Sequence, residues 1–434
     1  MKTNFISQIV LRLNYSTKVN KINLKKNREK LILIQKILTR NKNSIIKSIS
    51  KDVGKSKKDA LVEFNASINI WKYAINNIQK IRKNIKIRFN KKDEGEIIHK
   101  PIGLVAFITP WNYPLLTLSE RLPFCLATGS TAIIKQSEYC KNFNNVLFKI
   151  LSNKKYLFNT LHVLKDSNYR IGKYLCSNKN ISAISFVGSS QTGKKILLQS
   201  SSTLKKTFLE LGGKNSAIIT KNADLKLSIN DSIKGIFENG GQACVGISRL
   251  IIQKSIFKIF VKKLLYNIQK KYENKKLSFQ IPANNQQRKK ISRQISFIKK
   301  FRNKRIIKKF NFNSKKFTPI FLQPKKDDKY FINTEFFFPI VTIESFETLD
   351  EAIKINNKTD FGLATYIFTN NIQEKNKLST EVNSGRIWHN SSLVWNPNLP
   401  VGGFGLSGQD RDMGIKGFDN YLMTKSIYKR KIYG

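Results

Sequence analysis

The stretch SFVGSSQTGKKI, residues 185–196, starts with an apolar run, passes through a glycine-containing turn and continues into polar residues typical of a helix start. This pattern predicts a buried strand that leads into a helix. Free backbone N–H groups at a helix start favour phosphate, so Ser189 is a candidate phosphate contact. GSSQTGKK nearly matches the P-loop, but Lys195 stands where a magnesium-binding hydroxyl is required. A P-loop NTPase is therefore excluded, and the G-x-G-x-x-G dinucleotide fingerprint is absent as well.

Further short, apolar, β-branched runs lie on both sides of this stretch, with helical stretches between them. Near-continuous apolar strands that alternate with helices indicate a parallel sheet buried on both faces. We therefore predict an α/β fold. The runs are LVAFIT (104–109), TAIIK (131–135), ISAISFVG (181–188) and NSAIIT (215–220).

Two regions have a residue pattern that differs from that of the buried strands. Residues 24–82 carry Leu and Ile spaced by three and four positions, which predicts helices with a break near Gly54. Residues 84–100, NIKIRFNKKDEGEIIHK, are too polar for a core element. They predict a two-stranded hairpin that turns at DEG, residues 93–95.

The chain is strongly basic, with 79 Lys and Arg against 28 Asp and Glu among 434 residues and a formal net charge of +51. Such a charge is typical of nucleic-acid binding. Here, however, it is spread along the chain together with many Asn and Ile. The A/T-rich codons of Lys, Asn and Ile account for all three, so we expect no specific nucleic-acid partner.

The densest basic segment is residues 288–309, where Lys and Arg fill 11 of 22 positions. It is either a polyanion-binding helix or an ordinary helix with a solvated face, and the spacing of its apolar residues favours the second interpretation. The residues then expected to face inward are Ile291, Ile295, Ile298 and Phe301.

The cysteines and histidines indicate the redox state of the compartment and whether the chain has a metal site. The four cysteines show no CxxC pair and no disulfide-like spacing, which favours a reducing, cytoplasmic compartment. The three scattered histidines predict no metal site. No apolar run approaches the ~18 residues of a membrane-spanning helix. The N-terminus is basic and poor in acids, as a transit peptide is, but so is the whole chain, and we assign no targeting segment.

One cysteine has an unusual setting in ENGGQACVGISRL, residues 238–250. A buried structural cysteine usually lies in an apolar run, whereas Cys244 is surrounded by small residues that leave room for a molecule to approach the sulfur. Cys244 is therefore a candidate reactive thiol. Its small neighbours are Gly240, Gly241, Ala243 and Gly246.

Two polar residues are placed beside predicted strands. Glu210, in FLELGGKNSAII (208–219), lies in an apolar turn, where it either acts as a general base with a raised pKa or accepts hydrogen bonds from the turn. Asn112, in ITPWNYPLL (108–116), is held in a non-helical conformation by the prolines on either side. Its amide either donates to a developing oxyanion or caps a helix predicted for residues 115–128.

Taken together, these motifs resemble the NAD(P)-dependent aldehyde dehydrogenases. The resemblance covers the chain from about residue 30 to its end, and the spacing 244 − 210 = 34 between the cysteine and the glutamate is typical of that family. The order and approximate spacing of eight motifs agree. They are ITPWNYPLL, IIKQSE, FVGSSQTGKK, LELGGK, GGQACVG, EFFFPIV, FGLATYIFT and LPVGGFGLSG.

The resemblance implies a catalytic role for three residues. Cys244 would attack the aldehyde carbon as a thiolate, and Asn112 together with the Cys244 backbone N–H would stabilise the oxyanion. Hydride transfer to NAD would leave a thioester, and Glu210 would activate the water that releases the acid.

The resemblance also implies a cofactor site. Lys135 and Glu138 match the positions that contact the adenosine ribose, and a carboxylate there repels a 2′-phosphate, which favours NAD over NADP. Ser189 matches the contact to the pyrophosphate and Glu335 the contact to the nicotinamide ribose. The other expected cofactor contacts are Trp111, Gly188, Gly212 and Phe337.

The implied substrate contacts are Tyr113, Glu120 and Trp395. Aromatic faces and a carboxylate favour a cation, so one hypothesis is an amino- or ammonium-bearing aldehyde. Aromatic tunnels suit uncharged aldehydes equally well, and Glu120 can instead pair with its neighbour Arg121. Two departures from the family pattern lie near the site: Phe338 replaces a glycine, and Asp412 replaces a glutamate.

The family fold implies an NAD-binding parallel-sheet domain at 1–78 and 102–212 and a catalytic α/β domain at 213–421. It also implies an oligomerisation hairpin at 79–101 with a C-terminal strand at 422–434, and hence a homodimer or homotetramer. Two alternatives stay open. They are an acylating, coenzyme A-dependent relative, which would lack a general-base glutamate, and a degraded, non-catalytic member that binds polyanions.

Overall fold

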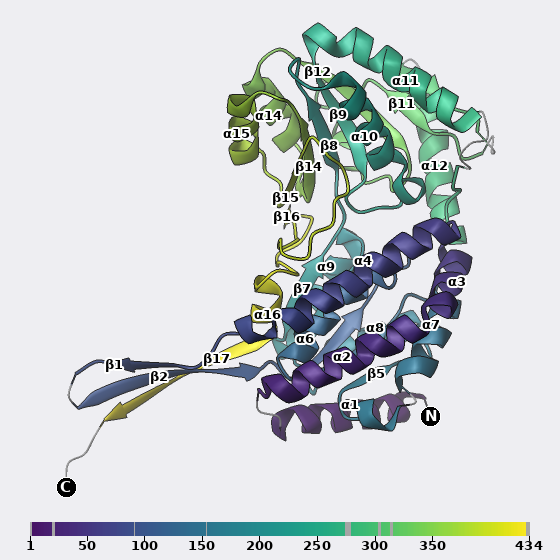
Figure 1. The fold of residues 1–434 in the computed structure, drawn as a ribbon. Coiled ribbons are helices and arrows are strands. Elements are labelled where there is room, and N and C mark those ends of the chain that lie inside the picture. Colours follow the sequence, from purple (N-terminus) through teal and green to yellow (C-terminus); the bar gives the residue numbers. More distant parts are fainter. Residues whose placement is uncertain are drawn as a thin grey trace.

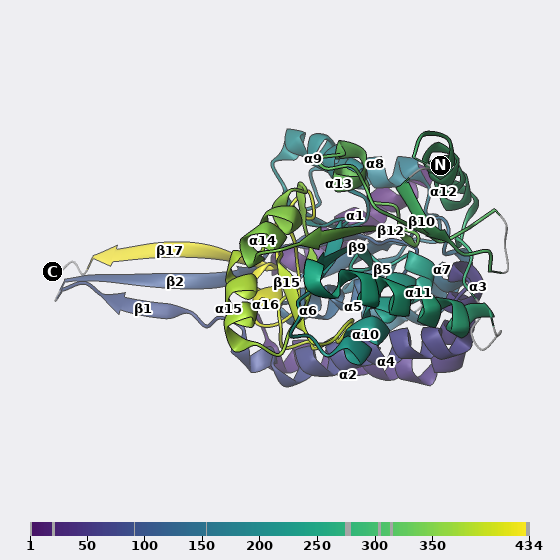
Figure 2. The ribbon, with the colours of Figure 1, turned by 90° about the horizontal axis from the view of Figure 1, so that it is seen from above.

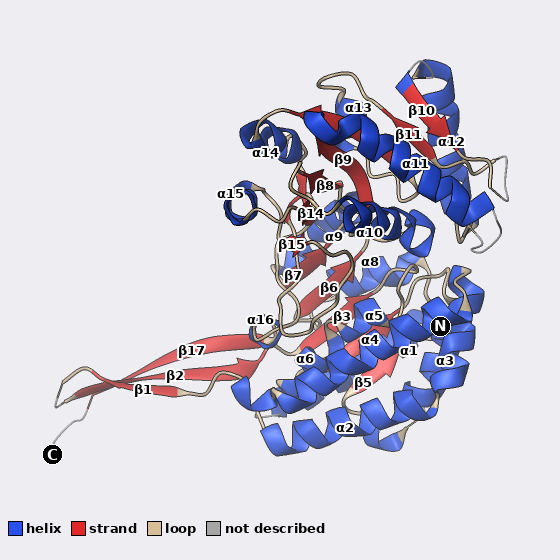
Figure 3. Cartoon of the chain, turned by 45° about the horizontal axis from the view of Figure 1, so that its top comes forward, coloured by secondary structure: helices blue, strands red, loops and turns tan. Residues whose placement is uncertain are grey.

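The computed structural model describes residues 2–19, 22–90, 92–152, 154–273, 279–302, 305–312 and 316–430. In this part of the chain, two large sheets form separate lobes, and a narrow three-stranded sheet projects from the body (Figure 1). Helices flank the strands of both lobes (Figure 3). The architecture is the α/β arrangement that the sequence predicts.

The first lobe contains a five-stranded sheet of order β5-β4-β3-β6-β7. Every neighbouring pair is parallel, as predicted from the apolar runs. The strands are β3 (Leu104–Ile108), β4 (Thr131–Lys135), β5 (Leu161–Val163), β6 (Ala183–Val187) and β7 (Lys206–Glu210).

Strand β3 explains why these runs are continuously apolar. Side chains alternate between the two faces of a strand. Val105 and Phe107 pack into the core cluster formed with α2, α3, α4, α6 and α7, whereas Leu104 and Ala106 pack into the cluster formed with α1, α8 and α9. Both faces are therefore buried. The helices of this lobe are α1 (Lys2–Val19), α2 (Leu24–Arg40), α3 (Lys42–Val53), α4 (Lys57–Asn76), α5 (Leu116–Ser119), α6 (Leu122–Ala127), α7 (Lys141–Leu147), α8 (Tyr169–Ser177) and α9 (Ser190–Ser200).

The N-terminal helices begin and end where local chemistry places them. Gly54 ends α3 in a left-handed conformation with φ +77°, which confirms the predicted break. The Ser56 side chain accepts a hydrogen bond from the Asp59 N–H and caps α4. Helix α1 buries Val10 and Leu13 in the same cluster as Leu104, so residues 2–19 are part of the fold.

The second lobe contains a seven-stranded sheet of order β10-β11-β12-β9-β8-β14-β15, in which only the β10–β11 pair is antiparallel. Its strands are β8 (Asn215–Ile219), β9 (Ile247–Gln253), β10 (Ile306–Lys309), β11 (Ile320–Leu322), β12 (Ile340–Phe346), β14 (Ala364–Phe368) and β15 (Arg386–His389). Its helices are α10 (Leu225–Phe237), α11 (Phe257–Glu273), α12 (Asn285–Phe301), α13 (Lys329–Asn333), α14 (Leu349–Asn357) and α15 (Ile372–Glu381).

The chain then returns to the first lobe. Strands β13 (Phe361–Gly362) and β16 (Phe404–Gly405) form a two-stranded pair, and α16 (Lys416–Asp419) packs against α6. This return places the loop around residues 401–412 beside the end of β7, where Glu210 forms an isolated antiparallel bridge with Gly408.

The projecting sheet contains β1 (Ile85–Arg88), β2 (Asp93–Pro101) and β17 (Leu422–Arg430) in the order β1-β2-β17 (Figures 1 and 2). The C-terminal strand predicted for 422–434 is confirmed over Leu422–Arg430, and the remaining residues 431–434 lie outside the described part of the chain. The predicted turn at DEG is wrong. Residues 93–95 already belong to β2, and Asp93 pairs with Arg430 at 2.8 Å. The turn forms just before them, because the Asn90 side chain accepts from the N–H groups of Lys92 and Asp93, each at 2.8 Å.

The basic segment 288–309 is divided between two elements, because α12 ends at Phe301 and β10 begins at Ile306. Ile291, Ile295 and Ile298 are buried as predicted. The prediction that Phe301 faces inward is wrong: this last residue of the helix is 54% exposed, and its ring lies 5.1 Å from that of Phe297.

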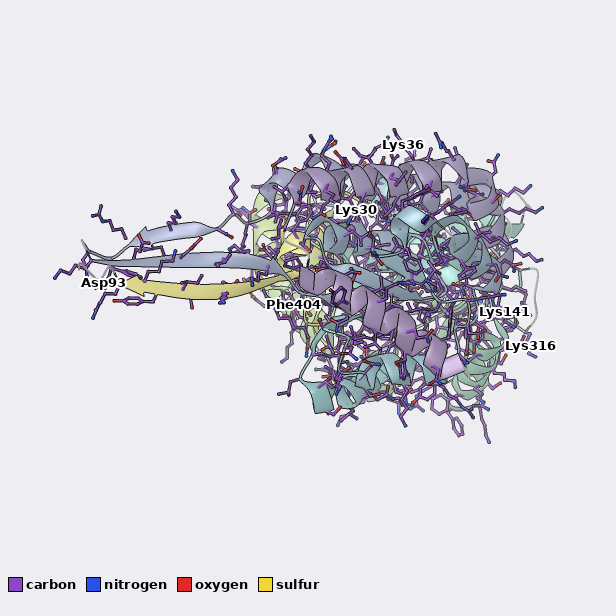
Figure 4. The ribbon with its side chains drawn as sticks, turned by 90° about the horizontal axis from the view of Figure 1, so that it is seen from below. Lys30, Lys36, Asp93, Lys141, Lys316 and Phe404 are labelled. Atoms are coloured by element: carbon purple, nitrogen blue, oxygen red, sulfur yellow. The ribbon has the colours of Figure 1, made fainter. Side chains whose placement is uncertain are left out.

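The basic charge is distributed over the molecule. Lys30 and Lys36 lie on α2, away from Lys141 and Lys316 (Figure 4). Within the described ranges, the structure contains no helix long and apolar enough to cross a membrane.

Candidate active site

A cavity of about 900 Å³ lies where the carboxyl ends of β3, β4, β6 and β7 face the second lobe. Ligands of open parallel sheets bind at this end of the strands. All fourteen residues that the sequence assigns to a site line this one cavity. They are Trp111, Asn112, Tyr113, Glu120, Lys135, Glu138, Gly188, Ser189, Glu210, Gly212, Cys244, Glu335, Phe337 and Trp395.

Cys244 lies in a tight loop between α10 and β9. The loop needs glycines, because Gly240 and Gly241 have φ of +66° and +77°, and a Cβ on Gly241 would lie 2.6 Å from Pro339. The Asn215 amide donates to the Cys244 carbonyl at 2.7 Å and fixes the backbone. The thiol is only partly buried and opens into the cavity.

The cavity disfavours ionisation of this thiol. Burial raises the pKa of Cys244 to about 12, with smaller contributions from the negative charges of Glu120, Glu210 and Glu335, while Arg386 acts in the opposite direction. A thiol with this pKa stays protonated at neutral pH. Nucleophilic chemistry at Cys244 therefore requires a group that accepts its proton.

Glu210 is the candidate for this group. It ends β7 and is buried, and its Oε1 has no hydrogen-bond partner among the described residues. Burial, followed by the charge of Asp412, raises the pKa of Glu210 well above its usual range. Glycine is required opposite it, since a Cβ on Gly402 would lie 2.8 Å from Oε1.

Asn112 is tied to the cysteine loop. Its Nδ2 donates to the Gln242 carbonyl at 2.9 Å, and Asn239 Nδ2 donates to the Asn112 carbonyl at 3.1 Å. The alternative role as a helix cap is wrong, because α5 begins after Leu115 without any side-chain cap. The second N–H of the Asn112 amide is available to a ligand.

The helix predicted over 115–128 is broken. Helix α5 ends at Ser119 and α6 starts at Leu122, with Pro123 in its first turn. Proline lacks an N–H and clashes with the carbonyl four residues earlier, so a continuous helix cannot pass this point. The break places Glu120 and Arg121 side by side in the cavity wall.

These two residues belong to a buried charged cluster. Arg121 Nη2 pairs with Asp412 Oδ2 at 2.5 Å, and Arg121 Nη1 lies 3.8 Å from Glu120 Oε2. Burial raises the pKa of Glu120 to about 7, although Arg121 and Arg386 lower it. Burial acts to lower the pKa of Arg121, but the carboxylates of Asp412 and Glu120 raise it above its usual range.

The part of the cavity assigned to the cofactor contains a helix start. Ser189 caps α9 by accepting from the Thr192 N–H at 3.3 Å, and Gly188 and Ser189 both line the cavity. Lys135 and Glu138 lie at the end of β4, where burial lowers the pKa of Lys135 and Glu138 raises it. The backbone N–H groups at the start of α9 fit a pyrophosphate, and the Lys135 and Glu138 side chains fit a ribose, so this part of the cavity fits a dinucleotide.

Glu335 is held against the double glycine that follows Glu210. The Gly213 N–H donates to Glu335 Oε1 at 3.1 Å, and a Cβ on Gly212 would collide with the same carboxylate. Phe337, with φ +56°, presents its ring edge-on to Trp111 at 5.8 Å.

The neighbouring Phe338 does not intrude into the cavity. It is buried and packs edge-to-face against Phe279 at 5.7 Å, within an aromatic cluster of the second lobe. The replacement of glycine at this position is therefore accommodated in the core.

Tyr113 is fixed on two sides. Its hydroxyl donates to Glu238 Oε1 at 2.7 Å, and the Lys55 Nζ lies 3.4 Å from its ring centre. Lys55 also forms a buried ion pair with Glu63 at 2.7 Å. Trp395, on the other side of the substrate region, has the Arg386 guanidinium 4.5 Å from its ring centre.

Sequence reasoning missed Lys55, Glu238 and Arg386 as site residues. Lys55 could not be distinguished among the 79 Lys and Arg of the chain. The signal for Arg386 was available, because it is a lone cation at the start of an apolar strand, in SGRIWHN. Within the described ranges, no group of three or more His, Cys, Asp or Glu could hold a metal ion.

A cysteine thiol, a buried carboxylate and a helix N-terminus meet in one cavity at the ends of parallel strands, an arrangement typical of α/β enzymes. The sequence model of the aldehyde dehydrogenase family matches residues 14–427. The family match covers nearly the whole chain, and we conclude that the chain belongs to the aldehyde dehydrogenase family. It is thus an oxidoreductase of a family that acts on aldehydes with NAD(P).

Individual relatives agree with this assignment. The chain is 28% identical over 417 residues to the betaine aldehyde dehydrogenase of Bacillus subtilis, covering 93% of this chain and 84% of the relative. It is 30% identical over 364 residues to aldehyde dehydrogenase (NAD(P)+) 1 of Saccharomyces cerevisiae, covering 79% and 70%. The crystal structure of Staphylococcus aureus betaine aldehyde dehydrogenase with NAD+ has a TM-score of 0.89 at 24% identity, covering 98% of this chain and 86% of that one.

Proposed function

We propose that this chain oxidises an aldehyde to the carboxylic acid with NAD, through a thioester on Cys244. The observation that carries the proposal is the meeting of Cys244, Glu210 and Asn112 in one cavity with a helix N-terminus and an acidic ribose site. Each of these groups has a role in that reaction and in few others.

The first step joins the Cys244 sulfur to the aldehyde carbon, and the carbonyl oxygen gains the electron pair. The thiol proton has to leave, and Glu210, whose pKa burial raises, is the buried carboxylate beside it that can hold a proton. The Asn112 amide, fixed by its bond to Gln242, donates its second N–H to the oxyanion.

When bound, NAD supplies the hydride acceptor that converts the adduct to a thioester. The residues of this chain position it: the Glu335 carboxylate is fixed by Gly213, and Trp111 and Phe337 form an aromatic wall. Their role is to hold a planar ring over the cysteine loop and to exclude water.

The second half of the reaction releases the acid. Glu210 first releases the thiol proton to solvent and is again a carboxylate. It then takes a proton from a water molecule, the hydroxyl attacks the thioester carbon, and the Cys244 sulfur leaves as a thiol with the proton that Glu210 returns. The free Oε1 of Glu210 provides the acceptor that this step requires.

Cofactor choice follows from Glu138, a carboxylate at the ribose end of the cavity that repels a 2′-phosphate. The cavity wall also carries Lys195, Lys289 and Lys290, which suit the pyrophosphate shared by both cofactors. The NAD+ in the S. aureus relative supports the choice of NAD, whereas the yeast relative is named for both cofactors.

The two alternatives are less well supported. An acylating, coenzyme A-dependent enzyme has no use for Glu210, which is retained at the cavity. A non-catalytic polyanion-binding protein would not need a cysteine loop, an oxyanion donor and a base in one place. We also propose a cytoplasmic location, an NAD-binding role for residues 1–78 and 102–212, and a catalytic role for residues 213–421.

We also propose a homodimer or homotetramer formed through the projecting sheet. Its strands expose large apolar side chains, which on a narrow sheet favour association. Ile85, Phe89 and Tyr428 are 51%, 56% and 60% exposed. Analytical ultracentrifugation of the whole chain tests this proposal, since a monomer at micromolar concentration contradicts it.

The enzymatic proposal is tested with the purified chain, NAD and a panel of aldehydes, with NADH absorbance as the readout. We expect one NADH and one free acid per aldehyde consumed. A product that forms only when coenzyme A is added supports the acylating alternative. No NADH from any aldehyde supports the non-catalytic one.

A further inference from the structure

Arg386 is a cation built into the substrate side of the cavity. It is the first residue of β15, and its side chain lines the cavity close to Trp395 and Glu120. Its guanidinium carbon lies 4.9 Å from the centre of the Trp388 ring and 4.5 Å from that of Trp395. Two tryptophans therefore hold the guanidinium in place without neutralising its charge.

The N–H groups of Arg386 are not used within the described part of the chain, where no hydrogen bond or ion pair to them is formed. Other buried arginines behave differently. Arg249 donates to three backbone carbonyls, at 3.0, 3.0 and 2.8 Å. Arg121 pairs with Asp412 at 2.5 Å. A guanidinium with open N–H groups in a cavity wall is arranged to bind an anion that enters from outside.

No acidic group among the described residues of the cavity is paired directly with Arg386. Asp412 is engaged with Arg121, and Glu120 lies beside the same arginine at 3.8 Å. Burial has the larger effect on the pKa of Arg386 and lowers it, while the charges of Glu120 and Glu210 raise it. Within the described residues, however, neither carboxylate forms a hydrogen bond or an ion pair with Arg386, so its N–H groups stay open to a ligand on the substrate side.

The aromatic faces that could hold a substrate cation are also in use. The Trp395 ring faces Arg386, and the Tyr113 ring faces Lys55 at 3.4 Å. An ammonium group entering between them would find each of these rings already in contact with a cation of the chain. This arrangement argues against the amino- or ammonium-bearing aldehyde that the sequence suggests.

We propose that Arg386 binds the distal carboxylate of the substrate, so that the chain oxidises aldehydes that carry an anionic group at the other end. This inference rests on the proposed aldehyde oxidation and names its substrate class. The guanidinium fork matches a carboxylate with two parallel N–H···O bonds, which an amide or an alkyl end cannot provide.

The test compares matched substrates. Straight-chain ω-oxo carboxylates are each paired with the uncharged ω-oxo amide and with the ω-amino aldehyde of equal length. In the parent, kcat/KM for the best carboxylate should exceed that for its amide by about tenfold or more, the value of one charge-assisted hydrogen bond. The ω-amino aldehyde should be the poorest of the three.

Three variants assign this preference to the residue. Arg386→Gln should reduce the carboxylate-to-amide ratio to about one, and Arg386→Lys should retain part of it, because the charge remains but the fork is lost. Arg302→Gln is the matched control. It removes an arginine that also lies over an aromatic ring, that of Phe297 at 5.8 Å, but outside the cavity, and it should keep the parent ratio.

Binding without turnover separates this inference from the proposed function. Calorimetry should show that the parent binds succinate more tightly than succinamide and that Arg386→Gln abolishes the difference. If no aldehyde is oxidised but this difference is found, the proposed function fails and the anion site stands. The inference is overturned if the carboxylate-to-amide ratio is equal in the parent and in Arg386→Gln. It is also overturned if kcat falls by the same factor for all substrates, because Arg386 would then act on Cys244 or on folding and not on the substrate carboxylate.

Discussion

Arg121 Nη2 pairs with Asp412 Oδ2 at 2.5 Å, and both side chains are almost completely buried. The pair joins the start of α6 to the returning C-terminal loop directly beside Glu210. Asp412 stands where the family usually has a glutamate, and its shorter side chain reaches the Arg121 guanidinium. The charge of Asp412 is also the second cause, after burial, of the raised pKa of Glu210.

Asp412→Asn should therefore change both stability and pH dependence. Removal of one partner of a buried ion pair leaves Arg121 uncompensated and should cost about 3–5 kcal/mol of unfolding free energy. Glu210 acts as a base only when ionised, so activity falls as pH falls through its pKa. Loss of the Asp412 charge lowers that pKa, and the acid limb of the pH–rate profile should move to lower pH.

Denaturant unfolding and the pH dependence of kcat measure these two effects. Asp419→Asn is the control, because Asp419 pairs with the exposed Arg82 at 2.8 Å and lies outside the cavity. An acid limb that stays in place in Asp412→Asn would show that this limb does not report Glu210.

Cys244→Ala should abolish NADH production, because the substrate then has no sulfur to form the adduct. Cofactor binding, measured by calorimetry, should remain, since the residues of the ribose and pyrophosphate sites are unchanged. Cys176→Ala is the control: it alters a buried cysteine of the first lobe, outside the cavity, and should keep activity. Turnover in Cys244→Ala contradicts the assignment.

Glu210→Gln should give a pre-steady-state burst of NADH followed by near-complete arrest, because the thioester accumulates when water is not activated. Hydroxylamine, a nucleophile that needs no base, should restore turnover. Rapid-mixing absorbance measures both phases. Steady-state turnover equal to that of the parent would assign the water activation to another group.

Glu138 should make kcat/KM for NAD exceed that for NADP by about tenfold, the effect of one carboxylate–phosphate repulsion of ~1.4 kcal/mol. In Glu138→Gln the ratio should approach one, while the exposed Glu29→Gln should leave it unchanged. Initial rates measured at varied NAD and NADP concentrations give the two kcat/KM values. Equal use of both cofactors by the parent refutes the role of Glu138.

Lys55→Met should destabilise the fold by about 3–5 kcal/mol, because it leaves the Glu63 carboxylate buried without its cation. Glu63 also accepts from the Leu115 N–H at 3.0 Å, so the loop that carries Asn112 and Tyr113 should loosen and KM should rise. Lys254→Met breaks an exposed pair with Glu347 and should leave the unfolding midpoint in place. Equal midpoints for the two variants would contradict this prediction.

Much of the fold was predictable from local patterns. The residues of β3 are apolar without interruption, and each is buried, because helices cover both faces of a parallel sheet. Gly54 ends a helix because its left-handed conformation costs glycine little. Fourteen candidate site residues were predicted from motifs, and all of them line one cavity, because the carboxyl ends of parallel strands meet at one edge.

Other features were decided by contacts between distant parts of the chain. Asp93 lies in β2 opposite Arg430 of the C-terminal strand and pairs with it, and Arg121 is neutralised by Asp412 on the returning loop. The open charge of Arg386 depends on two tryptophans and on the absence of a carboxylate partner within the described residues. A sequence pattern records which neighbours a residue has along the chain. Only the packing of the two lobes determines which charges are buried together and which one is left to face the substrate.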